Sequence, residues 1–135
     1  MQLNSKAVTI RSDLDIAAAR TTVRGIARTI GFNAVDQARI ATAVSELARN
    51  ILNYAGSGHV IIHEVEQGER KGIQIEAVDQ GPGIADVSKA LQEGYSTSGG
   101  TGMGLPGAKR LMNEFNVQTA PGAGTTITCL KWLGG

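Results

Sequence analysis

The sequence predicts one α+β (α/β) domain, a two-layer sandwich whose mixed, mostly antiparallel sheet carries helices on one face. Three observations predict this fold. The chain has 135 residues and 41% apolar residues, which suits one domain with its own core. The predicted order is strand, helix, helix, strand, strand, short helix, helix, strand, strand, so hairpins outnumber crossovers. No repeat, linker or low-complexity tail divides residues 1–135.

The N-terminal region predicts a strand followed by a helix. Residues Lys6–Arg11 are typical of a short edge strand. Ser12 or Asp13 can cap a helix that runs to about Ile30, and Gly31 ends it. The chain then turns directly into a second helix.

This second helix begins after the capping residue Asn33, continues to Ala55 and stops at Gly56. Its apolar residues form one stripe, as expected for a helix packed on a core. They are Ile40, Ala41, Val44, Leu47, Ala48, Ile51, Leu52 and Ala55.

The middle of the chain predicts a hairpin and then an irregular segment. Strands His59–Glu66 and Ile73–Val78 flank a polar turn at Gln67–Gly72. A short helix is expected at Asp86–Gln92, followed by a flexible stretch rich in Ser, Thr and Gly at Glu93–Gly104.

The C-terminal region predicts a helix and a closing hairpin. The helix spans Leu105–Phe115, with Pro106 near its first position, where proline is tolerated. Strands Asn116–Thr119 and Thr125–Trp132 follow, joined by a turn at Ala120–Gly124.

Composition excludes several classes of function. A net charge of +1 argues against broad nucleic-acid binding, no apolar run approaches the length of a membrane span, and no secretory signal is visible. The single cysteine, Cys129, predicts a buried, inert thiol and a cytoplasmic protein. His59 and His63 share one strand face without a nearby carboxylate in sequence, which favours structural histidines.

Glu46 and Asn50 form the first polar signature. They lie four residues apart on the second helix, opposite the apolar stripe, so their side chains are neighbours. A solvated helix face is the simpler interpretation of such a pair in isolation. The functional interpretation makes the Asn50 amide oxygen a Mg²⁺ ligand and Glu46 a base that accepts a proton from an attacking hydroxyl or water.

Residues Asp79 to Gly83, with the sequence Asp-Gln-Gly-Pro-Gly, form the second signature. Gly-Pro-Gly alone indicates a tight turn. At the end of a strand, Asp79 can instead accept a hydrogen bond from the exocyclic amine of adenine. Gly81 and Gly83 would then let the backbone pass close to the base.

The third signature is a glycine cluster, Gly100, Gly102 and Gly104, at the start of a predicted helix. A dinucleotide-binding fingerprint would follow a strand and would need an acidic residue about 20 positions further on, but no strand precedes this cluster and no acidic residue follows Glu114. A P-loop is excluded because no Gly-Lys-Ser/Thr follows the glycines. Free amides at a helix start favour phosphate oxygens. Lys109 and Arg110 on that helix are expected to be solvated.

Together these motifs resemble the GHKL (gyrase, Hsp90, histidine kinase, MutL) family, whose ATP-binding domain is the Bergerat fold. The resemblance covers about residues 6–132 and is carried by Glu46 to Asn50, Asp79 to Gly83 and Gly100 to Leu105. It implies ATP and Mg²⁺ as cofactors, and an ATP lid at about residues 86–101. It also implies that Thr125, after Gly124, supports Asp79 at the adenine.

A lone ATP-binding domain of this size resembles the serine/threonine kinases of bacterial partner-switching systems, in particular the stressosome switch kinases. Residues 109–115 and the ending Lys131-Trp132 add to this likeness. It implies a STAS-domain protein as substrate and scaffold, and a downstream regulator activated after release. Two alternatives remain open: an anti-sigma factor with kinase activity, and a non-catalytic module that uses ATP as a switch.

Overall fold

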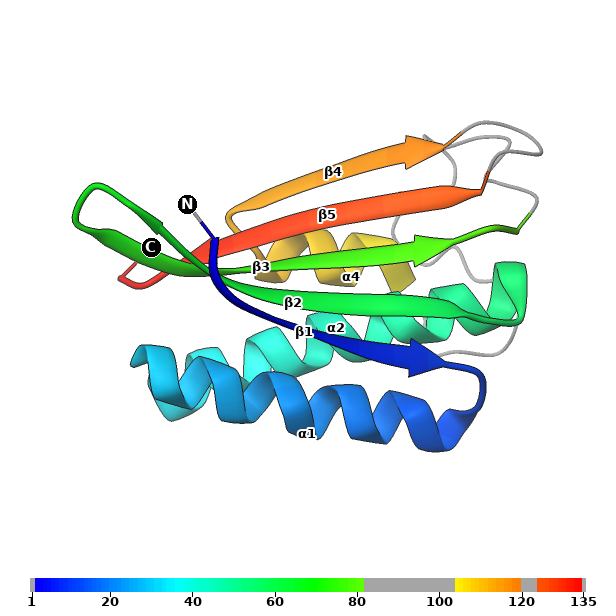
Figure 1. The fold of residues 1–135 in the computed structure, drawn as a ribbon, viewed down its shortest axis with the longest axis horizontal. Coiled ribbons are helices and arrows are strands. Elements are labelled where there is room, and N and C mark those ends of the chain that lie inside the picture. The colour runs from blue at the N-terminus through cyan, green and yellow to red at the C-terminus, as the bar shows by residue number, and fades with distance from the viewer. Residues whose placement is uncertain (1, 82–103, 120–123, 135) are drawn as a thin grey trace.

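The computed structural model describes residues 2–81, 104–119 and 124–134, which form a sheet with helices on one face (Figure 1). The sheet has five strands in the order β1-β2-β3-β5-β4, and each neighbouring pair is antiparallel. The strands are β1 (Gln2–Ile10), β2 (Gly58–Gln67), β3 (Arg70–Asp79), β4 (Glu114–Thr119) and β5 (Thr125–Trp132). The predicted two-layer architecture is confirmed, and the described sheet is antiparallel throughout.

The helical layer consists of α1 (Asp13–Ile30), α2 (Ala34–Ala55) and α4 (Gly104–Leu111). α2 is the middle helix, because it packs against α1, α4 and the central strands (Figure 1). The core lies between the layers, and its largest fully buried side chains come from both. They include Ile10, Ile16, Ile40, Leu47, Ile51, Ile62, Ile73, Ile75 and Ile127. No described helix is long and apolar enough to cross a membrane.

Local capping chemistry sets the ends of the first two helices as predicted. Asp15 Oδ2 accepts from the Ser12 backbone N–H at 3.1 Å, and Asn33 Oδ1 accepts from the Asp36 N–H at 2.8 Å. Gly56 ends α2 with φ +80°, a left-handed conformation that glycine adopts without a steric penalty.

Three predicted boundaries are wrong, each because strand pairing extends further than residue patterns indicate. β1 begins at Gln2, not Lys6, because the added residues pair with β2. The predicted turn over residues 67–72 shrinks to Gly68 and Glu69, since Gln67 pairs with Arg70.

The third wrong boundary is the end of the last helix, which stops at Leu111 and not at Phe115. Phe115 instead pairs with Cys129 in the sheet. The Asn113 N–H donates to the Leu130 carbonyl at 2.9 Å, which joins the chain to β5 as soon as α4 ends. The short helix predicted at 86–92 lies outside the described residues.

The structure gives His63 a carboxylate partner on the neighbouring strand, Glu76, which sequence spacing did not predict. His63 is buried on the sheet face away from the helices, with Ser5 Oγ 2.6 Å from Nδ1 and Glu76 Oε1 2.5 Å from Nε2. His59 is exposed, 3.4 Å from the Thr9 hydroxyl. Both predicted properties of Cys129, burial and low reactivity, agree with the structure, because burial raises the pKa of its thiol to about 12.

Candidate functional site

The C-terminal half of α2 places Glu46 and Asn50 inside the protein. Their side chains lie one helical turn apart, and the residues are only 8% and 9% exposed. The structure therefore excludes the solvated-face interpretation of this pair. α2 is the middle helix and packs against both α1 and α4. A carboxylate and an amide are rarely buried together on one helix face, because removing polar groups from water costs free energy.

Two glycines allow the C-terminal half of α2 to pack closely against the ends of β2 and β3. A methyl group added at Gly58 would lie 2.8 Å from the Ile51 Cγ2 atom, and one added at Gly81 would lie 2.6 Å from the Ala55 Cβ atom. Both distances are shorter than side-chain carbons tolerate, so only glycine permits this approach. For Gly81, the close neighbour seen in the structure is the end of α2. The expected role of Gly81 beside a base stays a prediction.

Asp79 ends β3 and is 5% exposed. Its Oδ1 atom accepts from the Gly81 N–H at 2.9 Å, so the aspartate itself holds the turn that follows the strand. No described residue donates a hydrogen bond to Oδ2. The carboxylate is thus fixed in direction through one oxygen while the other keeps its lone pairs for a ligand.

Thr125 stands directly opposite Asp79, as the first residue of β5. Thr125 also pairs with Thr119 of β4. Asp79, Thr125 and Thr119 therefore form a row across β3, β5 and β4 at one end of the sheet. Their side chains share the face that carries the helices, because directly paired residues of antiparallel strands point to the same side. Thr125 therefore pairs directly with Asp79, and its expected role at the adenine stays a prediction.

Gly124 supports the row from the backbone. It has φ +79°, and a methyl group there would lie 2.3 Å from the Asp79 carbonyl oxygen. The close approach keeps the start of β5 against the end of β3. Sequence analysis did not single out Thr119; its only signal is that threonines flank both sides of the closing turn.

Gly104 is the first residue of α4, which confirms a helix start at the third signature. Lys109 and Arg110, in the last turn of α4, are exposed as predicted. Gly83, Gly100, Gly102 and the expected lid at 86–101 lie outside the described residues.

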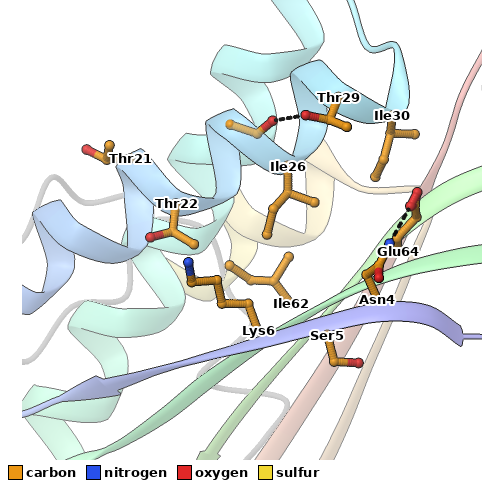
Figure 2. Close-up of a pocket in the computed structure, with 11 residues that line it drawn as sticks. Asn4, Ser5, Lys6, Thr21, Thr22, Ile26, Thr29, Ile30, Ile62 and Glu64 are labelled. Carbon is orange, nitrogen blue, oxygen red and sulfur yellow. Dashed lines mark hydrogen bonds between the residues drawn. The ribbon is translucent and has the colours of Figure 1, made fainter.

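One groove among the described residues lies away from these side chains. It has a volume of about 430 Å³ and runs between α1 and the edge strand β1 (Figure 2). Ile26 and Ile62 supply apolar surface, and Lys6 extends from β1 towards Thr22 of α1 (Figure 2). This groove includes none of the predicted site residues, whereas a smaller pocket of about 160 Å³ includes Asp79.

The comparisons with known proteins agree with the fold and the motifs. The family described as "Histidine kinase-, DNA gyrase B-, and HSP90-like ATPase" matches residues 35–133. The serine/threonine-protein kinase RsbT of Bacillus subtilis (strain 168) is 54% identical over 126 residues, which is 93% of this chain and 95% of that protein. The anti-sigma F factor of Thermoanaerobacter sp. (strain X514) is 33% identical over 86% of this chain and 84% of its own.

Solved structures repeat the architecture at much lower identity. A mycobacterial sensor histidine kinase, MprB, superposes with a TM-score of 0.55 at 16% identity, covering 96% of this chain and 97% of that chain. At that identity the likeness shows the fold alone. The extent of the sequence matches shows the family: this chain belongs to the histidine kinase-, DNA gyrase B- and HSP90-like ATPases, in the branch that contains the serine/threonine-protein kinase RsbT.

Proposed function

We propose that this chain is a cytoplasmic serine/threonine protein kinase that transfers the γ-phosphoryl group of ATP to a STAS-domain protein of a stressosome-type module. After phosphorylation and release, the kinase activates a downstream regulator such as a phosphatase. The 54% identity to RsbT over 93% of the chain supports the reaction class. The substrate and scaffold follow from the same resemblance.

The burial of Glu46 beside Asn50 is the observation that carries the proposal. In phosphoryl transfer the substrate hydroxyl oxygen bonds to the γ-phosphorus while the bond to the β–γ bridging oxygen breaks. The hydroxyl proton needs an acceptor, and Glu46 is a carboxylate held within the helical layer. A solvent-exposed glutamate on this helix would support no such role.

Asn50 fits the role of Mg²⁺ ligand. Its amide oxygen is a hard donor, one helical turn from the proposed base, and Mg²⁺ is typically held by few protein oxygens together with phosphates. When bound, the ion would neutralise charge on the β- and γ-phosphates. The N-terminus of α4 at Gly104, with Gly100 and Gly102 before it, would offer backbone amides to the same phosphates.

Asp79 and Thr125 would bind the adenine. The free Oδ2 of Asp79 would accept from the exocyclic amine, and Thr125 would stand beside it in the same row. Gly81 and Gly83 would carry the backbone past the base. The lid at about residues 86–101 would close over the nucleotide and exclude water.

The test uses labelled Mg-ATP with a STAS-domain protein encoded near this gene, scored for phosphoserine or phosphothreonine. Glu46→Gln should abolish transfer while ATP still binds. Glu69→Gln, an exposed glutamate in the β2–β3 turn, is the matched control and should transfer normally. Retained transfer in Glu46→Gln, or loss of its ATP binding, would contradict the assignment of the base.

Sequestration of a sigma subunit is the second candidate function. It is favoured by anti-sigma F factors that are 33% identical over 86% of the chain, a weaker likeness than that to RsbT. Capture of a sigma subunit by the purified chain, without phosphorylation of any STAS-domain partner, would favour this function over the switch kinase.

A further inference from the structure

Arg49 lies in sequence between the proposed base and the proposed Mg²⁺ ligand of α2, and it differs from both in its exposure. Glu46 and Asn50 are buried, at 8% and 9% exposed, whereas 40% of the Arg49 side chain is open to solvent. The Nη1 atom of Arg49 lies 3.8 Å from Oδ1 of Asp13, the first residue of α1. No step of the proposed transfer uses this arginine.

Arg49 and Asn50 flank Glu46 on opposite sides of the helix. An α-helix turns about 100° per residue, so Arg49 lies roughly 60° to one side of Glu46 and Asn50 roughly 40° to the other. The Arg49 side faces α1, because its partner Asp13 belongs to that helix and α1 packs along α2 (Figure 1). Glu46 therefore has the proposed metal ligand on one flank and a partly exposed cation on the other.

The ion pair between Arg49 and Asp13 contributes little to the stability of the fold. The Asp13 side chain is 85% exposed, and pairs of exposed charges are weak because water and salt screen them. Within the part of the chain that the structure describes, Asp13 is the one ion-pair partner of Arg49. The guanidinium can therefore exchange this carboxylate for another with little loss of stability.

This inference rests on the proposed function, in which Mg²⁺ and the phosphates lie on the Asn50 side of Glu46. The substrate hydroxyl attacks in line, opposite the leaving oxygen, so the protein that carries it approaches Glu46 from the Arg49 side. We propose that Arg49 is a substrate-positioning residue that binds an acidic side chain close to the phosphorylated serine or threonine of the protein substrate. Arginine suits this role because its planar guanidinium binds a carboxylate through two N–H groups. Asp13 holds the guanidinium until the substrate carboxylate displaces it.

Two substitutions that break the same ion pair should have opposite effects on the protein substrate. Arg49→Gln removes the docking charge, so the KM for the protein substrate should rise about three- to tenfold. Asp13→Asn removes the competing carboxylate, so this KM should fall about two- to threefold. If the pair merely joined α1 to α2, both substitutions would shift this KM in the same direction.

The experiment measures transfer from labelled Mg-ATP to the STAS-domain protein encoded near this gene. It determines kcat and KM for that protein, and the ATP dissociation constant by calorimetry; kcat and ATP affinity should stay near their wild-type values. Arg49→Lys keeps the charge but loses the paired contact, so its KM should be intermediate. Arg39→Gln is the matched control and should keep the wild-type KM, because Arg39 is a 54% exposed arginine of the same helix that is paired with Asp36 at 3.4 Å.

An unchanged KM in Arg49→Gln, or a KM that does not fall in Asp13→Asn, would overturn the inference. A loss of ATP affinity in Arg49→Gln would also overturn it, because Arg49 would then act on the nucleotide. Failure of the proposed function gives a different result. If wild type phosphorylates no STAS-domain protein, the proposed function is wrong and the inference falls with it. If wild type does so and Glu46→Gln does not, the kinase and its base stand whatever Arg49 does.

Discussion

Substitution of Gly124 by alanine tests whether the close contact between β5 and β3 holds the proposed adenine aspartate in place. Gly124 has φ +79°, and its added methyl group would lie 2.3 Å from the Asp79 carbonyl oxygen. Gly68 is a matched control, with φ +62° and nothing within 4 Å of an added methyl group. The two substitutions share the backbone penalty and differ in the contact with Asp79.

The expected magnitudes follow from these two geometries. A left-handed alanine costs about 1–2 kcal/mol, which is the whole effect expected at Gly68. Gly124→Ala adds about 1–3 kcal/mol of overpacking, for about 2–5 kcal/mol in total. At about 4 °C per kcal/mol for a domain of this size, Gly68→Ala should lower Tm by about 4–8 °C and Gly124→Ala by about 8–20 °C.

Nucleotide binding separates the two variants further. The clash at Gly124 must displace the Asp79 backbone, and the hydrogen bond of a charged group is worth about 1.5–3 kcal/mol, so ATP affinity should fall at least about tenfold. Gly68→Ala should bind ATP normally. Thermal denaturation and calorimetric ATP titration measure both effects. Equal losses of stability in the two variants, with unchanged ATP affinity, would refute the reasoning.

Three further predictions concern buried ionisable groups. Glu46→Gln should bind ATP yet transfer no phosphate, and a phosphorylation assay that finds substantial product would contradict its role as base. Burial raises the pKa of the Cys129 thiol from 9.0 to about 12, so its contribution to stability is full below pH 9 and is lost as pH rises from 9 towards 12. Between pH 9 and 12, urea titrations should show that the free energy of unfolding falls with pH less steeply in Cys129→Ala than in wild type, by about 1.4 kcal/mol per pH unit. Equal slopes in the two proteins would refute this. Lys131 Nζ lies 4.0 Å from Asp36 Oδ1, and the lysine side chain is only 6% exposed. Asp36→Ala leaves this buried charge unpaired and should lower the free energy of unfolding by about 3–5 kcal/mol in urea denaturation, whereas Lys131→Met removes the charge and should be nearly neutral. The reverse order would contradict the view that Lys131 is the buried partner of this pair.

Local chemistry explains what could be predicted about the elements. Asn33 and Gly56 mark both ends of α2 because capping depends only on residues within one turn of a helix end. The alternation of apolar and polar residues over Ile73–Val78 likewise predicts a strand. The predicted end of α4 was wrong by four residues. The helical pattern continues to Phe115, but that residue pairs with Cys129 and belongs to the sheet.

The sequence by itself determined the residue types of the site: a Glu and an Asn one helical turn apart, a strand-end Asp79 before glycines, and a glycine-led helix. Only the tertiary structure decided that Glu46 is buried, because burial depends on how α2 packs with the rest of the domain. It alone also placed Thr119 against Thr125. Strand register joins residues that local patterns treat separately, and a hydrogen bond across two strands exists only once that register is set.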